Sequence, residues 1–524
     1  MKRILPFLLL ILFGIEVVSQ NILITDISGN PFGFGPNEPS IMMDPNNTDI
    51  LVAGAILNSY YQSNDGGQTW SVGQLTSTYG VWGDPAIDVD NEGNFYYFHL
   101  SNEPGEDDWL DRIVCQKSTD KGNSWSNGSF TGLNGTKDQD KQWSVIDRAN
   151  NNIYLTWTQF DDYGSNDPTD ISVILFSKSL DGGESWSTPL RINKFEGDCL
   201  DGDDAVGGAV PAVGPNGEIY VSWAGPKGLV FNKSLDHGDT WLQEEILIDL
   251  MPGGWNQSIS GISRANGFPV TKCDLSGGPN HGTIYVNWSD QRNGEQDTEI
   301  WLSKSSDGGN SWSSATKVNN DNSNRQQFFT WMDIDQMNGN LHFVFYDRRN
   351  FSGDQTDVYL AFSNDGGKTF MNSRISETPF LPNKDIFFGD YTNITVHNNI
   401  VRPIWTRLHE GKLSVWTDIT PFEGILSADD EFANNEFESM VYPNPMVDEN
   451  NYVSFKLREA SIVKLEIFDQ QGKLIHRIFD NVEMGYGLYI IPIDINELNL
   501  ISGLYYTRLS VNGHSKTMKT IVIK

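Results

Sequence analysis

The chain of 524 residues carries acidic and aromatic side chains at the starts of several short, strand-like segments. Glu38, Asp84 and Asp390 each stand at such a start, and Tyr391 directly follows Asp390. Two carboxyl groups can act as general acid and general base, and a tyrosine hydroxyl can act as a nucleophile. We therefore predict these four as candidate catalytic residues. Capping of the backbone at the strand start is the competing interpretation for Glu38 and Asp84.

A second group of residues has the chemistry of ligand binding. Arg292, Arg349 and Arg407 follow strand-like segments in three successive parts of the chain. Guanidinium groups bind carboxylates through two parallel hydrogen bonds, which suits an anionic ligand. Trp143 and Trp331 offer flat rings on which a sugar can stack. We predict all five as candidate substrate-binding residues. Salt bridges that brace neighbouring strands are the competing interpretation for the arginines.

Metal chemistry has one weak candidate, the acidic loop 197–204 with the sequence GDCLDGDD. Its carboxylates suit Ca²⁺, but their spacing does not fit the twelve-residue helix-loop-helix pattern, which favours a solvated turn. The sequence shows no zinc-ligand spacing, no phosphate-binding glycine loop and no Ser-His-Asp elbow motif. We therefore expect no metal and no other cofactor, with Ca²⁺ at this loop as the open alternative.

The elements that must position these side chains follow from an internal repeat. One octapeptide occurs six times, starting at residues 63, 118, 179, 234, 305 and 363, as SNDGGQTW, STDKGNSW, SLDGGESW, SLDHGDTW, SSDGGNSW and SNDGGKTF. In such a turn the aspartate accepts backbone N–H groups, the glycine adopts a positive φ, and the terminal aromatic residue packs the hairpin. Segments between the copies alternate apolar and polar residues, as strands do. The spacing of 55–71 residues suits one four-stranded sheet per repeat.

The octapeptide resembles the aspartate box, S-x-D-x-G-x-[ST]-W, of the sialidase-like (BNR-repeat) β-propellers, over about residues 21–420. The resemblance implies an all-β propeller with the boxes between third and fourth strands, on the face opposite the active site. It also implies a glycoside hydrolase. Sialidases of this family carry an Arg-Ile-Pro motif at the first strand, where this chain has Glu38-Pro39-Ser40. The sialidase ligand set is therefore not transferred to this chain.

The number of sheets follows from the two ends of the repeat region. Segments 389–396, 400–405 and 412–416 resemble the first three strands of a further sheet without a seventh octapeptide. Residues 21–27 resemble the missing fourth strand. We therefore predict a seven-bladed propeller closed by its N-terminal strand, with the six blades of catalytic sialidases as the alternative.

The remaining segments indicate export. Residues 1–20 have a basic start and an apolar stretch, which predicts a signal peptide, with an N-terminal anchor as the alternative. An acidic linker is expected at 420–438. Residues 439–524 contain VYPNP at 441–445 and GLYYTR at 503–508, and resemble the sorting domain of the type IX secretion system, a small β-sandwich. That resemblance implies export across a gram-negative outer membrane by the secretion machinery. An ordinary immunoglobulin-like module is the alternative.

Composition narrows the function. The net charge of −33 disfavours nucleic acid and anionic membrane surfaces as partners, and no later apolar stretch is long enough to span a membrane. Three cysteines allow one disulfide at most, for which Cys199 with Cys273 is one option. We expect a secreted or surface-attached glycoside hydrolase acting on an extracellular glycan or glycoprotein. A non-catalytic glycan- or protein-binding propeller is the alternative.

Overall fold

A computed structural model describes residues 20–27, 35–102, 110–421, 439–442, 444–447, 451–457, 461–485, 487–496, 498–512 and 514–524. The predicted signal peptide, except Gln20, and the predicted linker, except residues 420 and 421, lie outside these described residues. The chain divides into two compact units, one spanning Ser19–Leu426 and the other containing Ser427–Lys524.

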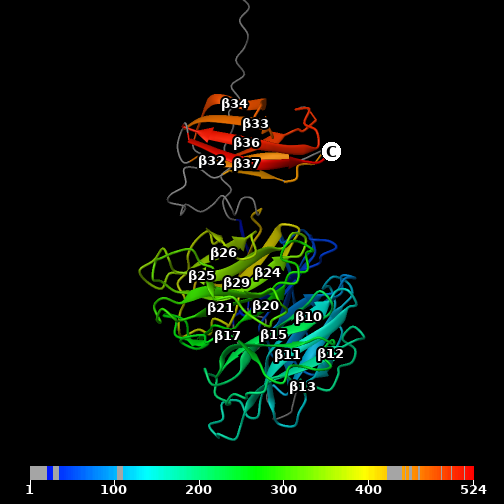
Figure 1. Cartoon of the computed structure of the whole chain (residues 1–524). Coiled ribbons are helices and arrows are strands. Elements are labelled where there is room, and N and C mark those ends of the chain that lie inside the picture. The colour runs from blue at the N-terminus through cyan, green and yellow to red at the C-terminus, as the bar shows by residue number, and fades with distance from the viewer. Residues whose placement is uncertain are drawn as a thin grey trace, which may run out of the picture. The chain divides into compact units, whose positions relative to one another are not determined.

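The described part of the first unit contains seven four-stranded antiparallel sheets (Figure 1). Sheets 1 to 3 consist of β2 (Ser40–Met43), β3 (Leu51–Ala55), β4 (Ser59–Ser63) and β5 (Ser71–Gln74); β6 (Ala86–Val89), β7 (Phe95–Ser101), β8 (Arg112–Ser118) and β9 (Ser129–Thr131); and β10 (Asp138–Asp147), β11 (Asn152–Phe160), β12 (Ser172–Ser179) and β13 (Leu190–Arg191). Sheets 4 and 5 consist of β14 (Gly207–Val213), β15 (Ile219–Gly225), β16 (Gly228–Ser234) and β17 (Ile246–Asp249); and β20 (Val270–Cys273), β21 (Ile284–Asp290), β22 (Glu299–Ser305) and β23 (Thr316–Lys317). Sheets 6 and 7 consist of β24 (Gln327–Asp335), β25 (Asn340–Asp347), β26 (Asp357–Ser363) and β27 (Met371–Arg374); and β28 (Asn393–His397), β29 (Ile400–His409), β30 (Lys412–Asp418) and β1 (Asn21–Thr25).

The first strands of the seven sheets contact one another in a closed cycle, in the order β2, β6, β10, β14, β20, β24, β28 and again β2. The second strands bury large aromatic side chains between the sheets, among them Trp157, Trp223, Trp288 and Trp405, which are fully buried. Burial of such rings is the main favourable contribution to packing. The predicted all-β propeller architecture is confirmed.

Sheet 7 is completed by the N-terminal strand. β1 pairs antiparallel with β30, with Asn21 opposite Asp418, and the Asn21 side-chain amide donates to the Asp418 carboxylate at 2.8 Å. This pairing covers the hydrogen-bonding edge that β30 would otherwise present to solvent. The prediction that the N-terminal segment supplies the missing fourth strand is confirmed.

The six octapeptides form turns between the third and fourth strands, and we call them the octapeptide turns. In the turn after β12, Asp181 accepts hydrogen bonds from the Ser179 hydroxyl at 2.7 Å and the Ser185 amide at 2.9 Å, while Gly182 has a φ of 73°. The register pairs Ser63 with Leu51, and Leu51 with Met43. Each turn therefore lies level with the end of the first strand and away from its start.

The second unit is a β-sandwich of two antiparallel sheets. One contains β31 (Ser439–Tyr442), β32 (Asn451–Leu457) and β35 (Gly487–Ile493), and the other contains β34 (Leu474–Met484), β33 (Ser461–Asp469), β36 (Gly503–Val511) and β37 (His514–Val522). Phe455 of the first sheet and Leu465 and Leu509 of the second belong to one buried core. This shared core holds the two sheets face to face.

The cysteines do not pair. Cys115, Cys199 and Cys273 are buried free thiols, so the proposed Cys199–Cys273 disulfide is wrong. Cys199 and Cys273 lie in two separate apolar clusters, each filling space as a small apolar side chain. In the part of the chain that the structure describes, no helix has the length and apolar character needed to cross a membrane.

Candidate functional site

Three charged residues stand at the starts of the first strands of sheets 1 to 3 with the same unusual backbone. Glu38, Asp84 and Lys141 have φ angles of 53°, 50° and 54°. This left-handed conformation is uncommon for residues other than glycine, and it concentrates at functional sites. In β10 the register shifts between Asp140 and Trp143, which is the mark of a bulge around Lys141. The three side chains belong to one cluster, because Asp84 and Lys141 both contribute to the electrostatic environment of Glu38.

Lys141 is the centre of this cluster. Its ammonium lies 3.2 Å from a carboxylate oxygen of Asp84, 2.9 Å from one of Asp390 and 3.7 Å from one of Asp140. These side chains are at most 12% exposed. One cation is thus shared by carboxylates from sheets 2, 3 and 7, where little water screens the charges.

A second cation reaches the cluster from the connection between sheets 4 and 5. This connection contains the two-residue strands β18 (Asn256–Gln257) and β19 (Ala265–Asn266), with Arg264 just before β19. The Arg264 Nε donates to Asp390 at 3.0 Å, its Nη2 also bonds Asp390, and its Nη1 donates to Asp201 at 2.9 Å. Asn266 donates to the Asp390 carbonyl at 3.0 Å. The connection therefore meets sheet 7 across the site.

Sequence reasoning did not include Arg264 or Asp140 among the candidate residues, and it considered Asp201 only as part of the acidic loop 197–204. The one available signal for Arg264 was the spacing of 71 residues between the fourth and fifth octapeptides, the longest of the five. A repeat longer than its neighbours indicates an insertion, and insertions in a propeller form loops that can carry function.

Glu38 is a carboxyl group of the cluster whose pKa is raised. It is 2% exposed, and its Oε1 has no hydrogen-bond partner among the described residues. Burial raises the pKa of Glu38 well above its usual value, and the negative charges of Asp84 and Asp390 raise it further. Lys141 and Arg264 act in the opposite direction without reversing the shift. The surroundings of Glu38 therefore favour its protonated form over its ionised form.

Asp390 is the opposite case. Burial opposes its ionisation, but the neighbouring charges of Lys141 and Arg264 outweigh burial and hold the pKa of Asp390 well below its usual range. Burial raises the pKa of Asp140 to about 6, with Lys141 working against the shift. The cluster thus raises the pKa of one carboxyl group and lowers that of another, a separation that is common at active sites.

A cavity of about 330 Å³ opens beside these groups. Its size is at the lower end of the range found for small-molecule sites. The polar part of the lining contains the carboxyl groups of Glu38, Asp84 and Asp140 together with Lys141 and Arg264. The rest of the lining is mostly apolar or aromatic and consists of Ile56, Leu57, Trp82, Leu100, Leu110, Tyr163 and Phe387. The cavity can enclose a small polar ligand with a proton donor and a carboxylate beside it.

Three predicted aromatic residues pack together instead of lining this cavity. The ring of Trp143 lies 4.4 Å from that of Trp331 and 4.9 Å from that of Tyr391, measured between centroids, and all three are buried. The Tyr391 hydroxyl donates to the Pro85 carbonyl at 3.4 Å. Burial, followed by the charges of Asp84 and Glu38, raises the pKa of Tyr391 well above its usual value. The hydroxyl is therefore protonated, and the three rings fill the space between sheets 3, 6 and 7.

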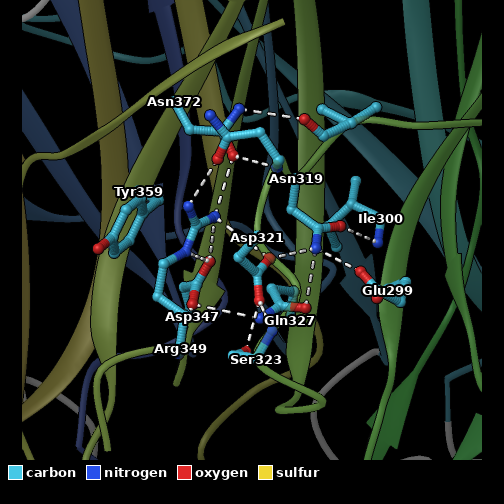
Figure 2. A network of polar contacts seen from close by, with 12 residues as sticks. Glu299, Ile300, Asn319, Asp321, Ser323, Gln327, Asp347, Arg349, Tyr359 and Asn372 are labelled. Atoms are coloured by element: carbon cyan, nitrogen blue, oxygen red, sulfur yellow. Dashed lines mark hydrogen bonds and ion pairs between the residues drawn. The ribbon is translucent and has the colours of Figure 1, made fainter. Parts of the chain in front are cut away.

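The predicted arginines lie in separate networks. Figure 2 shows Arg349 beside Asp347, with its guanidinium near Asn372 and the ring of Tyr359. Its Nη2 lies 2.7 Å from an Asp347 oxygen and donates to Asn372 at 2.9 Å, while its Nη1 donates to Asn320 at 2.8 Å. Asn320 follows sheet 5, whereas the other residues belong to sheet 6 or directly follow one of its strands. The guanidinium therefore joins two sheets.

Arg292 and Arg407 also join neighbouring sheets through their guanidinium groups. Arg292 of sheet 5 lies 2.5 Å from Asp290 and 3.1 Å from Asp249 at the end of sheet 4. Arg407 of sheet 7 donates to Thr378, which follows sheet 6, at 3.1 Å, and lies over the ring of Trp416. These contacts support the bracing interpretation of the three arginines.

Three of the four carboxylates of the acidic loop have contacts within the protein. Asp201 pairs with Arg264, Asp203 accepts the Asn256 amide at 2.7 Å, and Asp198 accepts the Leu200 amide at 3.2 Å. Within the described ranges, no group of three or more His, Cys, Asp or Glu side chains is arranged to hold a metal ion. The contacts are those of a structured turn.

The sequence of the β-sandwich unit identifies the domain family to which this unit belongs. Residues 440–524 match the secretion system C-terminal sorting domain. This is the sorting domain of the type IX secretion system, as its sequence motifs indicated. The sorting domain implies interaction with the secretion machinery, and it supports secretion of the protein or its attachment at the cell surface.

Solved structures with similar folds include several glycoside hydrolases. A Hadza microbial sialidase, Hz136, is 14% identical, with 73% of this chain and 75% of that chain covered and a TM-score of 0.40. The Penicillium chrysogenum α-L-arabinanase bound to arabinobiose is 16% identical over 63% and 93%, with a TM-score of 0.40. The Fusarium graminearum GH93 α-L-arabinofuranosidase bound to arabinobiose is 13% identical over 78% and 99%, with a TM-score of 0.43. No curated protein matches the chain. The fold assignment therefore rests on the seven sheets themselves.

Proposed function

We propose that the first unit is a glycoside hydrolase acting on extracellular glycans, with the cavity beside Glu38 as its active site. The observation that carries the proposal is the setting of Glu38, a buried carboxyl group with an unpartnered oxygen beside a cavity, whose pKa burial raises. Hydrolysis of a glycosidic bond requires such a proton donor together with a second carboxyl group. Asp84 lines the same cavity and supplies that second group.

In the proposed reaction Glu38 donates its proton to the glycosidic oxygen as the bond to the anomeric carbon breaks. The bonding electron pair stays with the leaving oxygen. Asp84 assists the attack of water at the anomeric carbon, either by accepting a proton from that water or by first forming a glycosyl ester that water then cleaves. The anomer of the first product, observed by NMR, distinguishes these two routes.

The other charged residues position this pair. The Lys141 ammonium holds the Asp84 carboxylate at 3.2 Å, and Asp390 fixes both Lys141 and Arg264. The surrounding negative charge stabilises the positive charge that develops on the sugar ring in the transition state. Tyr391 packs with Trp143, and its hydroxyl is near enough to Asp84 and Glu38 for these carboxyl groups to raise its pKa. Asp390 and Tyr391 are therefore positioning residues in this proposal.

The decisive experiment uses the full-length protein and a panel of aryl glycosides, including pyranosides and furanosides of both anomeric forms. Turnover by the wild-type protein is expected, and Glu38→Gln is expected to lower kcat by about 10²- to 10⁴-fold, the usual contribution of a general acid. Asp181→Asn, in an octapeptide turn at the other end of the strands, is the matched control and is expected to leave kcat unchanged.

The pH profile gives a second readout. Because Glu38 acts in its protonated form, activity is expected to fall as pH rises through its raised pKa, and this alkaline limb is expected to disappear in Glu38→Gln. Binding of glycans without turnover by the wild-type protein would contradict the proposal and favour a non-catalytic binding propeller.

A further inference from the structure

We infer that the sugar bound in this cavity carries no acidic group, an inference that rests on the proposed function because it assigns the substrate class of the same site. The charges around the cavity are unbalanced. Five carboxyl groups, those of Glu38, Asp84, Asp140, Asp201 and Asp390, surround the two cations Lys141 and Arg264. Even without Glu38, four carboxyl groups face two cations.

Both cations are already occupied by the protein's own carboxylates. The Nε and Nη2 atoms of Arg264 form a two-pronged contact with Asp390, and the Nη1 atom bonds Asp201 at 2.9 Å. Lys141 directs its ammonium at Asp84 and Asp390. A sugar carboxylate would have to displace one of these partners, or it would enter as a further negative charge beside carboxyl groups that already outnumber the cations.

The rest of the lining suits an uncharged ring. Trp82, Tyr163 and Phe387 line the cavity with aromatic surface, on which the C–H faces of a neutral sugar can pack. The excess of negative charge also favours a neutral substrate, because only the transition state then develops the positive charge that the carboxylates stabilise. Arg292, Arg349 and Arg407 offer no alternative anion site in the cavity, because none of them is among the residues that line it.

The test compares matched aryl glycosides that differ only at the acidic group, such as glucosides with glucuronides and galactosides with galacturonides, in both anomeric forms. A neutral substrate is expected to be hydrolysed with a kcat/KM at least about 100-fold above that of its acidic counterpart, since like charges in a buried site are strongly disfavoured. Equal or faster hydrolysis of the acidic member, or of an aryl sialoside, would overturn the inference while leaving the proposed function intact.

Failure of the proposed function itself has a different signature. If no glycoside is hydrolysed, calorimetric titration of the full-length protein with galactose and with galacturonic acid tests the inference directly. Binding of galactose with no heat from galacturonic acid supports it. Tighter binding of the acid, or binding of neither sugar, overturns it.

A charge variant tests the cause of the selectivity. Asp201→Asn removes one negative charge and releases the Nη1 atom of Arg264, so the preference for the neutral substrate is expected to fall by about tenfold. Asp204→Asn, an exposed position in the same loop, is the matched control and is expected to leave the preference unchanged. An unchanged preference in Asp201→Asn, with the protein folded as judged by its Tm, would show that the carboxylate excess does not set the specificity.

Discussion

The two ends of the propeller strands use carboxyl groups in opposite ways. In the octapeptide turns, hydrogen bonds from the serine or threonine four residues later lower the pKa of Asp181 and Asp236 to about 2. At the starts of the first strands, burial raises the pKa of Glu38 well above its usual value and that of Asp140 to about 6. The turns stabilise a carboxylate that is exposed to water, whereas burial beside the cavity disfavours the charged form of Glu38 and Asp140.

The two ends of the strands also differ in how far their residues repeat from sheet to sheet. The six octapeptide turns keep nearly the same residues because each solves the same local problem of closing a hairpin. The positions with left-handed backbone at the first strands instead carry Glu38, Asp84, Lys141, Gly208 and Phe329 in sheets 1, 2, 3, 4 and 6. Three of these positions, Glu38, Asp84 and Lys141, carry charged side chains that line the same cavity, whereas Phe329 packs in the hydrophobic core.

The largest expected effect on stability comes from breaking the cavity's ion pairs. Lys141→Met leaves the buried carboxylates of Asp84 and Asp390 without their shared cation and is expected to lower the free energy of unfolding by about 3–5 kcal/mol. Lys178→Met, which removes the pair with the exposed Asp239 next to an octapeptide turn, is the matched control and should cost at most about 1 kcal/mol. Urea denaturation of both variants measures the two losses in the free energy of unfolding. Equal losses would contradict the contrast between the cavity and the octapeptide turns.

An intermediate effect is expected from the pH dependence of the cavity. Because the pKa of Asp140 is raised to about 6 in the folded protein, the folded state binds more protons than the unfolded state between about pH 4 and pH 6. Stability therefore falls as pH rises through this window. Asp140→Asn is expected to reduce that decline, with a gain on the order of 2 kcal/mol at pH 7 and none near pH 3. Denaturant midpoints measured from pH 3 to pH 8 test this, and a parallel profile for the variant would contradict it.

The smallest effect is expected at the turns. Asp181→Ala removes the carboxylate that accepts bonds from Ser179 and Ser185, and it is expected to cost about 1 kcal/mol because the site is exposed to solvent. The lowered pKa places this contribution above about pH 4, with loss as pH falls toward about 2. The Tm of the variant, measured at pH 7 and at pH 2.5, should differ from that of the wild-type protein by less at the lower pH.

Much of the architecture was predictable because it depends on local repetition. Period-two alternation and the octapeptides located strands and turns, and the unmatched segment 21–27 identified the strand that completes sheet 7. The recurrence of charged residues at strand starts placed Glu38, Asp84 and Asp390 in one set, and the structure brings these three together around Lys141.

The rest of the site depends on contacts that no local pattern encodes. Arg264 reaches Asp390 across 126 residues of sequence, through a connection whose path is set by the packing of sheets 4, 5 and 7. Arg349 is a residue that the sequence wrongly suggests is available to a ligand. Its sequence context suits a ligand-binding residue, but its guanidinium already bonds Asp347 and Asn372. Residue type indicates what a side chain can bind, and only the fold determines whether a partner within the protein already binds it.

The pairing of β1 with β30 has a consequence for the time course of folding. Asn21 and Asp418, which bond across this pair, are 397 residues apart, and joining the ends of a flexible chain of that length costs about 5 kcal/mol of loop-closure entropy. Contacts that close so long a loop form late, after the sheets between them. Glu38 lies in sheet 1 and Asp390 precedes the first strand of sheet 7, so their electrostatic coupling also awaits this last step. A chain that is still being synthesised or moved in extended form therefore lacks the assembled charge cluster around Lys141.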